Sequence, residues 1–204
     1  MNLPIIQVVV EGDTDVPFVE RLCTASGFEV RAPMIAARGK SEVDKLIPGY
    51  ARAGRGWPHL VVRDLDQDAA CAPGLVDVLL ATTPGDYFAL RIAVRAVESW
   101  FLADRDHAAR ALSVKASQIT LRPDDEPDPK RTIVDLAQRS TKPEIKRAIV
   151  PPPHFSRKSG PGYEAWLLKS ATAWRLDRAL ANSPSLASAQ ARLTDLCRRW
   201  QAER

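Results

Sequence analysis

Residues 60–68 read LVVRDLDQD, an apolar run that ends in alternating carboxylates. A strand points successive side chains to opposite faces, so Asp64 and Asp66 are expected on one side where the strand ends. Two carboxylates held this close repel each other, which raises a pKa unless a cation lies between them. A divalent cation such as Mg²⁺ prefers oxygen ligands and would meet that need. The alternative is a polar turn after a buried strand, with the acids capping the next helix.

A second apolar run, residues 3–10 (LPIIQVVV), ends directly before Glu11 and Gly12. Runs rich in β-branched residues are typical of strands buried on both faces of a parallel sheet. Further strands are predicted over residues 28–37 and 88–94, and amphipathic helical patterns separate the strands. The predicted fold is therefore α/β, a parallel sheet of about four strands with helices on both faces.

Acidic residues follow three of these predicted strands. Glu11 follows the first, Asp64 and Asp66 the third, and Glu98 the fourth. Right-handed crossovers place the carboxyl ends of parallel strands along one edge, where ligand sites of open α/β sheets lie. Dispersed carboxylates gathered at one edge are costly to keep ionised without a cation. This combination favours a metal site over a polar turn.

Glu11-Gly12 after the first strand and Asp64-Leu65-Asp66 after the third resemble the motifs of the toprim domain, found in topoisomerases, DnaG-type primases and nucleases of the overcoming-lysogenization-defect family. Residues 11–15 (EGDTD) are similar to the first motif of the nuclease branch. Residues 96–104, with their Glu98-Ser99-Trp100 segment, resemble a small group of bacterial toprim-like proteins. The resemblance covers residues 1–104 and implies a toprim-like fold.

The resemblance implies a Mg²⁺- or Mn²⁺-dependent nuclease that hydrolyses phosphodiesters of DNA or RNA. By motif, Asp64 and Asp66 would bind metal, and Glu11 would bind metal or act as general base. Glu98 and Asp15 are candidates for a second ion, as in two-metal nucleases. No tyrosine near these motifs suits a topoisomerase-type covalent step. Candidates for contact with the nucleic-acid phosphates are Arg38, Lys40, Lys142 and Lys146.

The two halves of the chain differ in charge. Residues 1–104 carry a net charge of −4 and residues 105–204 a net charge of +8. The second half is predicted to be a basic, mainly helical extension packed on the core, with helices over 131–138, 142–149, 163–181 and 184–200. A basic, glycine-containing loop over 155–162 separates two of them. An acidic half with carboxylate motifs beside a basic half suggests a metal site next to a polyanion-binding surface.

Composition and residue spacing argue against several other classes of protein. No apolar run reaches the ~18 residues of a membrane span, and the N-terminus has no secretion-signal pattern. The three cysteines lack metal-ligand spacing and are expected to be reduced thiols of a cytoplasmic protein. Residues 34–41 lack the first glycine of an ATP-binding loop, since Met34 stands there. The sequence leaves open whether the protein acts alone or with an ATPase or other protein partner. It also leaves open a homodimer that forms through the C-terminal helix.

Two rival functions remain. A toprim-like module could bind nucleic acid or a partner without cleaving it. A phosphatase of the haloacid-dehalogenase type would use a carboxylate nucleophile after its first strand, where this chain has Glu11-Gly12. A nuclease could serve phage defence, repair or a toxin-like role, and the sequence does not rank these.

Overall fold

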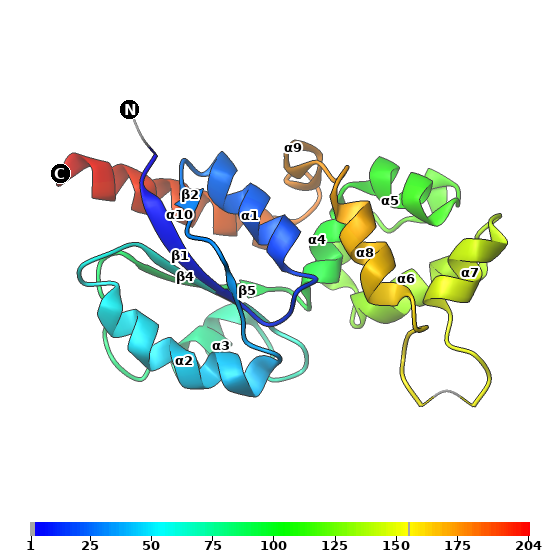
Figure 1. Ribbon diagram of the computed structural model, residues 1–204, viewed down its shortest axis with the longest axis horizontal. Coiled ribbons are helices and arrows are strands. Elements are labelled where there is room, and N and C mark those ends of the chain that lie inside the picture. Colours follow the sequence, from blue (N-terminus) through cyan, green and yellow to red (C-terminus); the bar gives the residue numbers. More distant parts are fainter. Residues whose placement is uncertain (1–2, 155) are drawn as a thin grey trace. The chain divides into compact units, whose positions relative to one another are not determined.

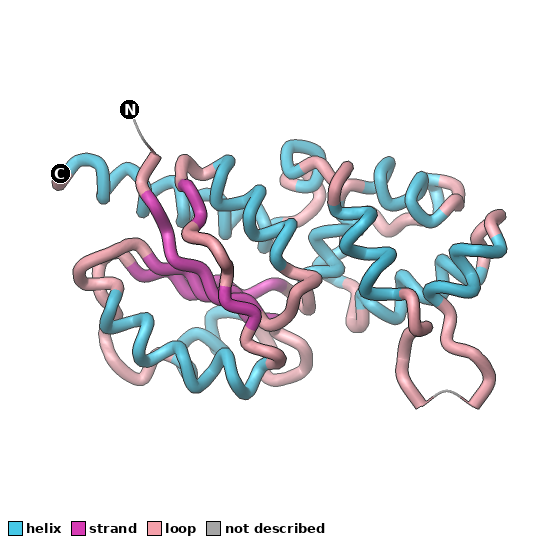
Figure 2. The backbone as a smooth tube through the Cα atoms, viewed as in Figure 1, coloured by secondary structure: helices cyan, strands magenta, loops and turns pink. Residues whose placement is uncertain are grey.

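Five strands form one parallel sheet in the computed structural model, which describes residues 3–154 and 156–204 (Figures 1 and 2). The central strand β1 (Ile5–Val10) pairs with β4 (His59–Asp64), which pairs in turn with β5 (Phe88–Ala93). Val8 aligns with Leu60, and Asp64 at the end of β4 aligns with Ala93. The predicted parallel α/β sheet is confirmed.

The predicted strand over residues 28–37 is two short strands, β2 (Glu29–Val30) and β3 (Ile35–Ala36). Both pair with β1 in parallel, β2 near its start and β3 near its end. Pro33 lies between them and has no N–H to donate to the ladder, so the strand is interrupted there.

Helices cover both faces of the sheet (Figure 1). On one face lie α1 (Val16–Ala25) and α10 (Pro184–Ala202), and on the other lie α2 (Lys40–Ala53) and α3 (Ala72–Leu79). The apolar stripes predicted for α1 and α10 are buried as expected, because period 3.6 turns those positions toward the sheet. The core beneath α2 and α3 contains Val43, Ile47, Val61, Leu75, Phe88, Leu90 and Ile92.

The chain divides into two compact units, which are described separately. The sheet unit comprises Met1–Val94 and Ser185–Arg204, and the helical unit comprises Arg95–Pro184. This division differs from the predicted boundary after residue 104, because α10 packs within the sheet unit. There the Cys197 thiol lies 3.4 Å from the Gly27 carbonyl oxygen, and the Trp200 ring meets the rings of Trp57 and Tyr87 edge-on.

The helical unit is built around α4 (Val97–Ala103), nearly all of which is buried. The indole of Trp174 donates to the Trp100 carbonyl at 3.0 Å, and the Asn182 amide donates to the Ala103 carbonyl at 2.9 Å. Buried Asp104 accepts hydrogen bonds from the backbone N–H groups of His107 and Arg175. The Glu98-Ser99-Trp100 segment thus supplies a core element of this unit.

Among its described residues, the helical unit has seven further short helical segments. They are α5 (Arg105–Leu112), η1 (Ala116–Gln118), η2 (Pro123–Asp125), α6 (Pro129–Gln138), α7 (Pro143–Ile149), α8 (Tyr163–Ala171) and α9 (Leu176–Ala179). The helix predicted over 163–181 is therefore two helices, and α5 was not predicted. Phe155, the first residue of the predicted basic loop, lies outside the described residues. Within the described part of the chain, no helix has both the length and the apolarity needed to cross a membrane.

Candidate carboxylate site

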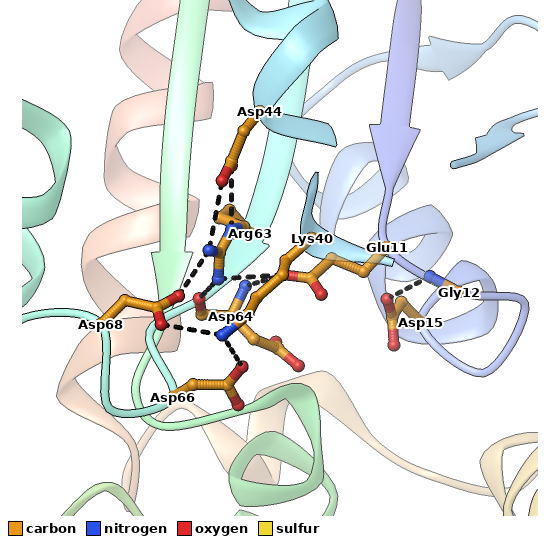
Figure 3. Close-up of polar contacts among 9 residues, drawn as sticks. All are labelled: Glu11, Gly12, Asp15, Lys40, Asp44, Arg63, Asp64, Asp66 and Asp68. Atoms are coloured by element: carbon orange, nitrogen blue, oxygen red, sulfur yellow. Dashed lines mark hydrogen bonds and ion pairs between the residues drawn. The ribbon is translucent and has the colours of Figure 1, made fainter. Parts of the chain in front are cut away.

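Glu11, which directly follows β1, reaches across to the end of β4 (Figure 3). Its Oε1 accepts a hydrogen bond from the Asp64 backbone N–H at 2.8 Å and lies 3.3 Å from a guanidinium nitrogen of Arg63. Burial raises the pKa of Glu11, and the Asp64 N–H and the Arg63 charge only partly oppose this rise. The carboxylate is therefore a stronger base than that of a surface glutamate.

Asp64 and Asp66 flank Leu65, which is buried and still bonded to β5 through its N–H and the Ala93 carbonyl. Asp64 is the last residue of β4. Asp66 lies beyond the strand in a left-handed conformation, with φ of 47°. The chain has thus begun to turn at Asp66, and strand alternation alone does not set the direction of its side chain.

Arg63 lies at the centre of the charged cluster, with only 2% of its side chain exposed. Its Nε lies 3.0 Å from Asp44 Oδ1, and another guanidinium nitrogen lies 2.5 Å from Asp68 Oδ2. It also donates to the Asp64 carbonyl. Burial by itself would lower the pKa of Arg63, but the hydrogen bonds to Asp44 and Asp68 outweigh it and the pKa is raised. Arg63 is therefore a permanent counter-charge beneath the carboxylates.

Lys40, the first residue of α2, provides a second cation (Figure 3). Its ammonium lies 2.8 Å from Asp68 Oδ1 and 3.4 Å from Asp66 Oδ2. Hydrogen bonds from Lys40 and Arg63 lower the pKa of Asp68, and the Asp68 bond raises the pKa of Lys40. Lys40 was predicted to contact phosphate, and here its partners are two carboxylates.

Asp15 and Arg38 have local roles on the same side of the sheet unit. Asp15 is buried, and its two carboxylate oxygens accept hydrogen bonds from the Gly12 N–H at 2.9 Å and the Thr14 hydroxyl at 3.3 Å. These bonds hold the turn between β1 and α1. Arg38 is exposed in a left-handed conformation in the turn before α2, where the Gly39 N–H donates to the Glu11 carbonyl.

The remaining predicted site residues belong to the helical unit. Glu98 lies in the first turn of α4, and its carboxylate accepts a hydrogen bond from the Tyr163 hydroxyl at 3.1 Å. Lys142 precedes the first residue of α7, and Lys146 lies in the last turn of that helix; both are exposed. The structure therefore joins four predicted site residues in one cluster of the sheet unit: Glu11, Asp64, Asp66 and Lys40. Glu98, Lys142 and Lys146 belong to the helical unit.

The donor chemistry suits a hard divalent ion, because the cluster offers carboxylate oxygens from two neighbouring strand ends. Among the described residues, however, no group of three or more His, Cys, Asp or Glu side chains is arranged to hold a metal ion. Mg²⁺ is commonly held by only one or two carboxylates, together with waters and substrate phosphates. Glu11 and Asp64 lie at neighbouring strand ends and are candidates for such a pair, whereas Asp66 would have to exchange its contact with Lys40 for one with the ion.

Sequence reasoning missed Arg63 and Asp44, and it left Asp68 outside the core site as a residue past the strand end. All three belong to the cluster. One signal was present: a charged residue inside the buried run HLVVRD needs a partner, because burying an unpaired charge is costly. Nothing in the sequence indicated that the partners would come from α2 and from the turn after β4.

Comparisons of the chain with models of known protein families, with curated proteins and with solved structures gave no match.

Proposed function

We propose that the chain is a divalent-metal-dependent nuclease of the toprim type, with its site at Glu11, Asp64 and Asp66. The observation that carries the proposal is the link between two strand ends, Glu11 Oε1 to the Asp64 N–H at 2.8 Å. This bond joins the Glu11 carboxylate to the backbone of Asp64, a residue far away in the sequence, at the edge of the sheet where ligand sites of parallel α/β folds lie. The motif resemblance supports the same conclusion.

In this proposal each side chain has a defined task. Asp64 and Asp66 would hold Mg²⁺ or Mn²⁺, with Glu11 as a further ligand or as general base, and the ion when bound supplies Lewis acidity toward a phosphoryl oxygen. As general base, Glu11 would accept a proton from an attacking water, and the raised pKa of its metal-free carboxylate supports that role. The Lys40 ammonium, half-exposed and at the start of α2, would move from Asp66 and Asp68 to a non-bridging phosphate oxygen. Arg63 is a positioning residue, because it is too deeply buried to meet substrate.

The test is a cleavage assay on supercoiled plasmid, single-stranded DNA and RNA with Mn²⁺ or Mg²⁺. Asp64→Asn and Glu11→Gln should each reduce cleavage by at least about 100-fold, the upper range of losses from disturbed metal sites. Asp77→Asn, which neutralises an exposed aspartate of α3, is the matched control and should cleave as wild type does. Cleavage that survives in Asp64→Asn, or no cleavage of any substrate, would refute the proposal.

One observation favours a second candidate, a module that binds nucleic acid or a protein partner without cleaving it. Arg63 and Lys40 already pair with four carboxylates of the cluster, so these side chains have cationic partners without a metal ion. Calorimetric titration with Mn²⁺ separates the two candidates. Metal binding that Asp64→Asn abolishes supports the nuclease, whereas nucleic-acid binding without metal binding supports the module.

A further inference from the structure

The helical unit contains an open cavity of about 540 Å³ beside the N-terminus of α8. Its wall is formed by the basic loop over residues 156–161, with Lys130 from α6 and Tyr163 and Glu164 from α8. The volume lies within the range of pockets that bind small ligands. The lining has both polar and apolar surface and contains three cations, Lys130, Arg157 and Lys158, against one carboxylate, Glu164.

Close backbone packing fixes one side of this cavity. The Gly160 N–H donates to the Ile149 carbonyl at 2.7 Å, and the Gly162 N–H donates to the Ala148 carbonyl at 2.9 Å. A Cβ added to Gly160 would come within 2.6 Å of the Ala148 carbonyl oxygen, so no side chain fits there. The glycines therefore let the loop lie directly against the end of α7, which holds the cavity wall in place.

Lys130 is held at the cavity by an aromatic contact. Its ammonium lies 4.6 Å from the centroid of the Tyr163 ring. Tyr163 is itself 1% exposed and fixed through its hydroxyl bond to Glu98. The ring thus orients the ammonium without neutralising it, because a cation–π contact leaves the positive charge in place.

The positive charge of the cavity is only partly compensated. Lys158 lies 3.5 Å from Asp128 and is largely exposed. Within the described ranges 3–154 and 156–204, Lys130 and Arg157 form no ion pair with a carboxylate. The first turn of α8 adds the partial positive charge of a helix N-terminus, which Glu164 partly offsets. Two serines, Ser156 and Ser159, add hydroxyl donors to the lining.

The geometry points to a phosphate-binding pocket at Lys130, Arg157 and Lys158. A guanidinium fork, ammonium groups, hydroxyls and a helix N-terminus together match the oxygens of a phosphate group. The phosphate could belong to a nucleic-acid strand or to a free phosphate or mononucleotide. This inference does not rest on the proposed nuclease activity, because it concerns binding in the helical unit alone.

The test measures binding by the full chain in EDTA, so that its outcome is independent of any cleavage. The probes are a fluorescein-labelled single-stranded oligonucleotide, followed by anisotropy, and inorganic phosphate or a mononucleotide, followed by thermal shift. The pocket variants are Lys130→Gln and the double variant Arg157→Gln/Lys158→Gln. The matched control is Lys115→Gln/Lys169→Gln, which removes the same charge from exposed positions of the helical unit outside the cavity.

For a strand ligand, the double pocket variant should bind the oligonucleotide about tenfold more weakly and reduce the salt slope by about 1 to 1.5. The control should stay within about twofold of wild type. Stabilisation by phosphate or mononucleotide alone, lost in the pocket variants, would instead assign the pocket to a small phosphate ligand. Circular dichroism checks that each variant is folded.

Three outcomes would overturn the inference. The first is that neither probe binds the wild-type chain. The second is that the pocket and control variants lose the same affinity, which would indicate diffuse attraction to the basic unit. The third is that fluorescein-labelled polyglutamate with the same net charge as the oligonucleotide binds the wild-type chain as tightly as the oligonucleotide does, which would remove the preference for phosphate.

Discussion

The two units differ in whether their clustered cations have carboxylate partners. In the sheet unit, Arg63 pairs with carboxylates from three different segments and Lys40 pairs with two carboxylates of the turn after β4, so both cations have partners within the unit. In the helical unit, Lys130 and Arg157 line an open cavity and form no ion pair among the described residues. A ligand of the first cluster must compete with existing partners. A ligand of the cavity in the helical unit would supply an anionic partner, which Lys130 and Arg157 lack within the described part of the chain. Its binding should raise the free energy of unfolding of that unit, and tighter binding should raise it more.

The largest expected effect is the removal of the internal counter-charge. Arg63→Met keeps an apolar stem but leaves Glu11, Asp44 and Asp68 with no guanidinium partner. We expect a loss of about 3 kcal/mol in the free energy of unfolding, because the carboxylates left behind are partly buried and mutually repulsive. Urea unfolding measures it. Arg52→Met on the exposed side of α2 should change stability by less than about 0.5 kcal/mol; equal losses would sink this account of the cluster.

A smaller effect is expected where a neutral hydroxyl holds a carboxylate. Tyr163→Phe removes the bond to Glu98 while it preserves the ring under Lys130. We expect a loss of about 1 to 2 kcal/mol, since the tyrosine is buried and its partner keeps some access to water. The double variant Tyr163→Phe/Glu98→Gln measures the coupling between the two side chains. Additive losses would mean that the bond contributes nothing.

A smaller change still is expected at Lys40, whose side chain is 43% exposed. Lys40→Gln should alter the free energy of unfolding by less than about 1 kcal/mol, because water screens a half-exposed ion pair. The same variant should bind Mn²⁺ more tightly than wild type, since the ion no longer competes with the ammonium for Asp66. Calorimetric titration of both proteins tests this. Weaker Mn²⁺ binding in Lys40→Gln would contradict the competition.

The most subtle prediction concerns pH. The folded chain raises the pKa of Glu11 above its ordinary value of 4.5, chiefly through burial. The protonated form is thus favoured by folding, and this contribution is present below about pH 4.5 and lost as pH rises through the raised pKa. Glu11→Gln cannot lose this contribution. As pH rises from about 4.5 through the raised pKa, the melting temperature of Glu11→Gln should therefore increase relative to that of the wild type. Melting curves in EDTA, with Glu20→Gln as an exposed control, check the trend; a constant difference would contradict it.

The sequence predicted those features of the fold that depend on local residue patterns, and it predicted the others less well. The runs at residues 3–10 and 60–64 predicted β1 and β4, because a continuous β-branched stretch has few alternatives to a buried strand. The break between β2 and β3 was readable at Pro33 but was overlooked. Helix α5 escaped prediction because it is short and follows α4 after a single residue, Asp104, whose carboxylate accepts from the His107 N–H.

The site was predictable only in part, for the same reason. Parallel-sheet topology predicted that Glu11 and Asp64 lie at one edge of the sheet, because the carboxyl ends of parallel strands share an edge. That β1 and β4 are neighbours, so that the two residues are bonded, is seen only in the structure. The counter-charges were not foreseen, since Asp44 approaches Arg63 from a helix whose rotation the sequence pattern does not specify to within one side chain. The amphipathic stripe of α10 predicted that it packs on the core, and the structure places it in the sheet unit.

The return of α10 to the sheet unit also bears on synthesis. The helical unit is an insertion between β5 and α10, so residues 95–184 leave the ribosome before the sheet unit receives its last helix. Domains usually fold in the order in which they are synthesised. Here the inserted unit can fold first. The part of the sheet face that α10 covers stays exposed until the buried residues of α10 are synthesised, among them Leu186, Leu193, Leu196 and Trp200. A nascent chain stalled before α10 should therefore need a chaperone to shield that face.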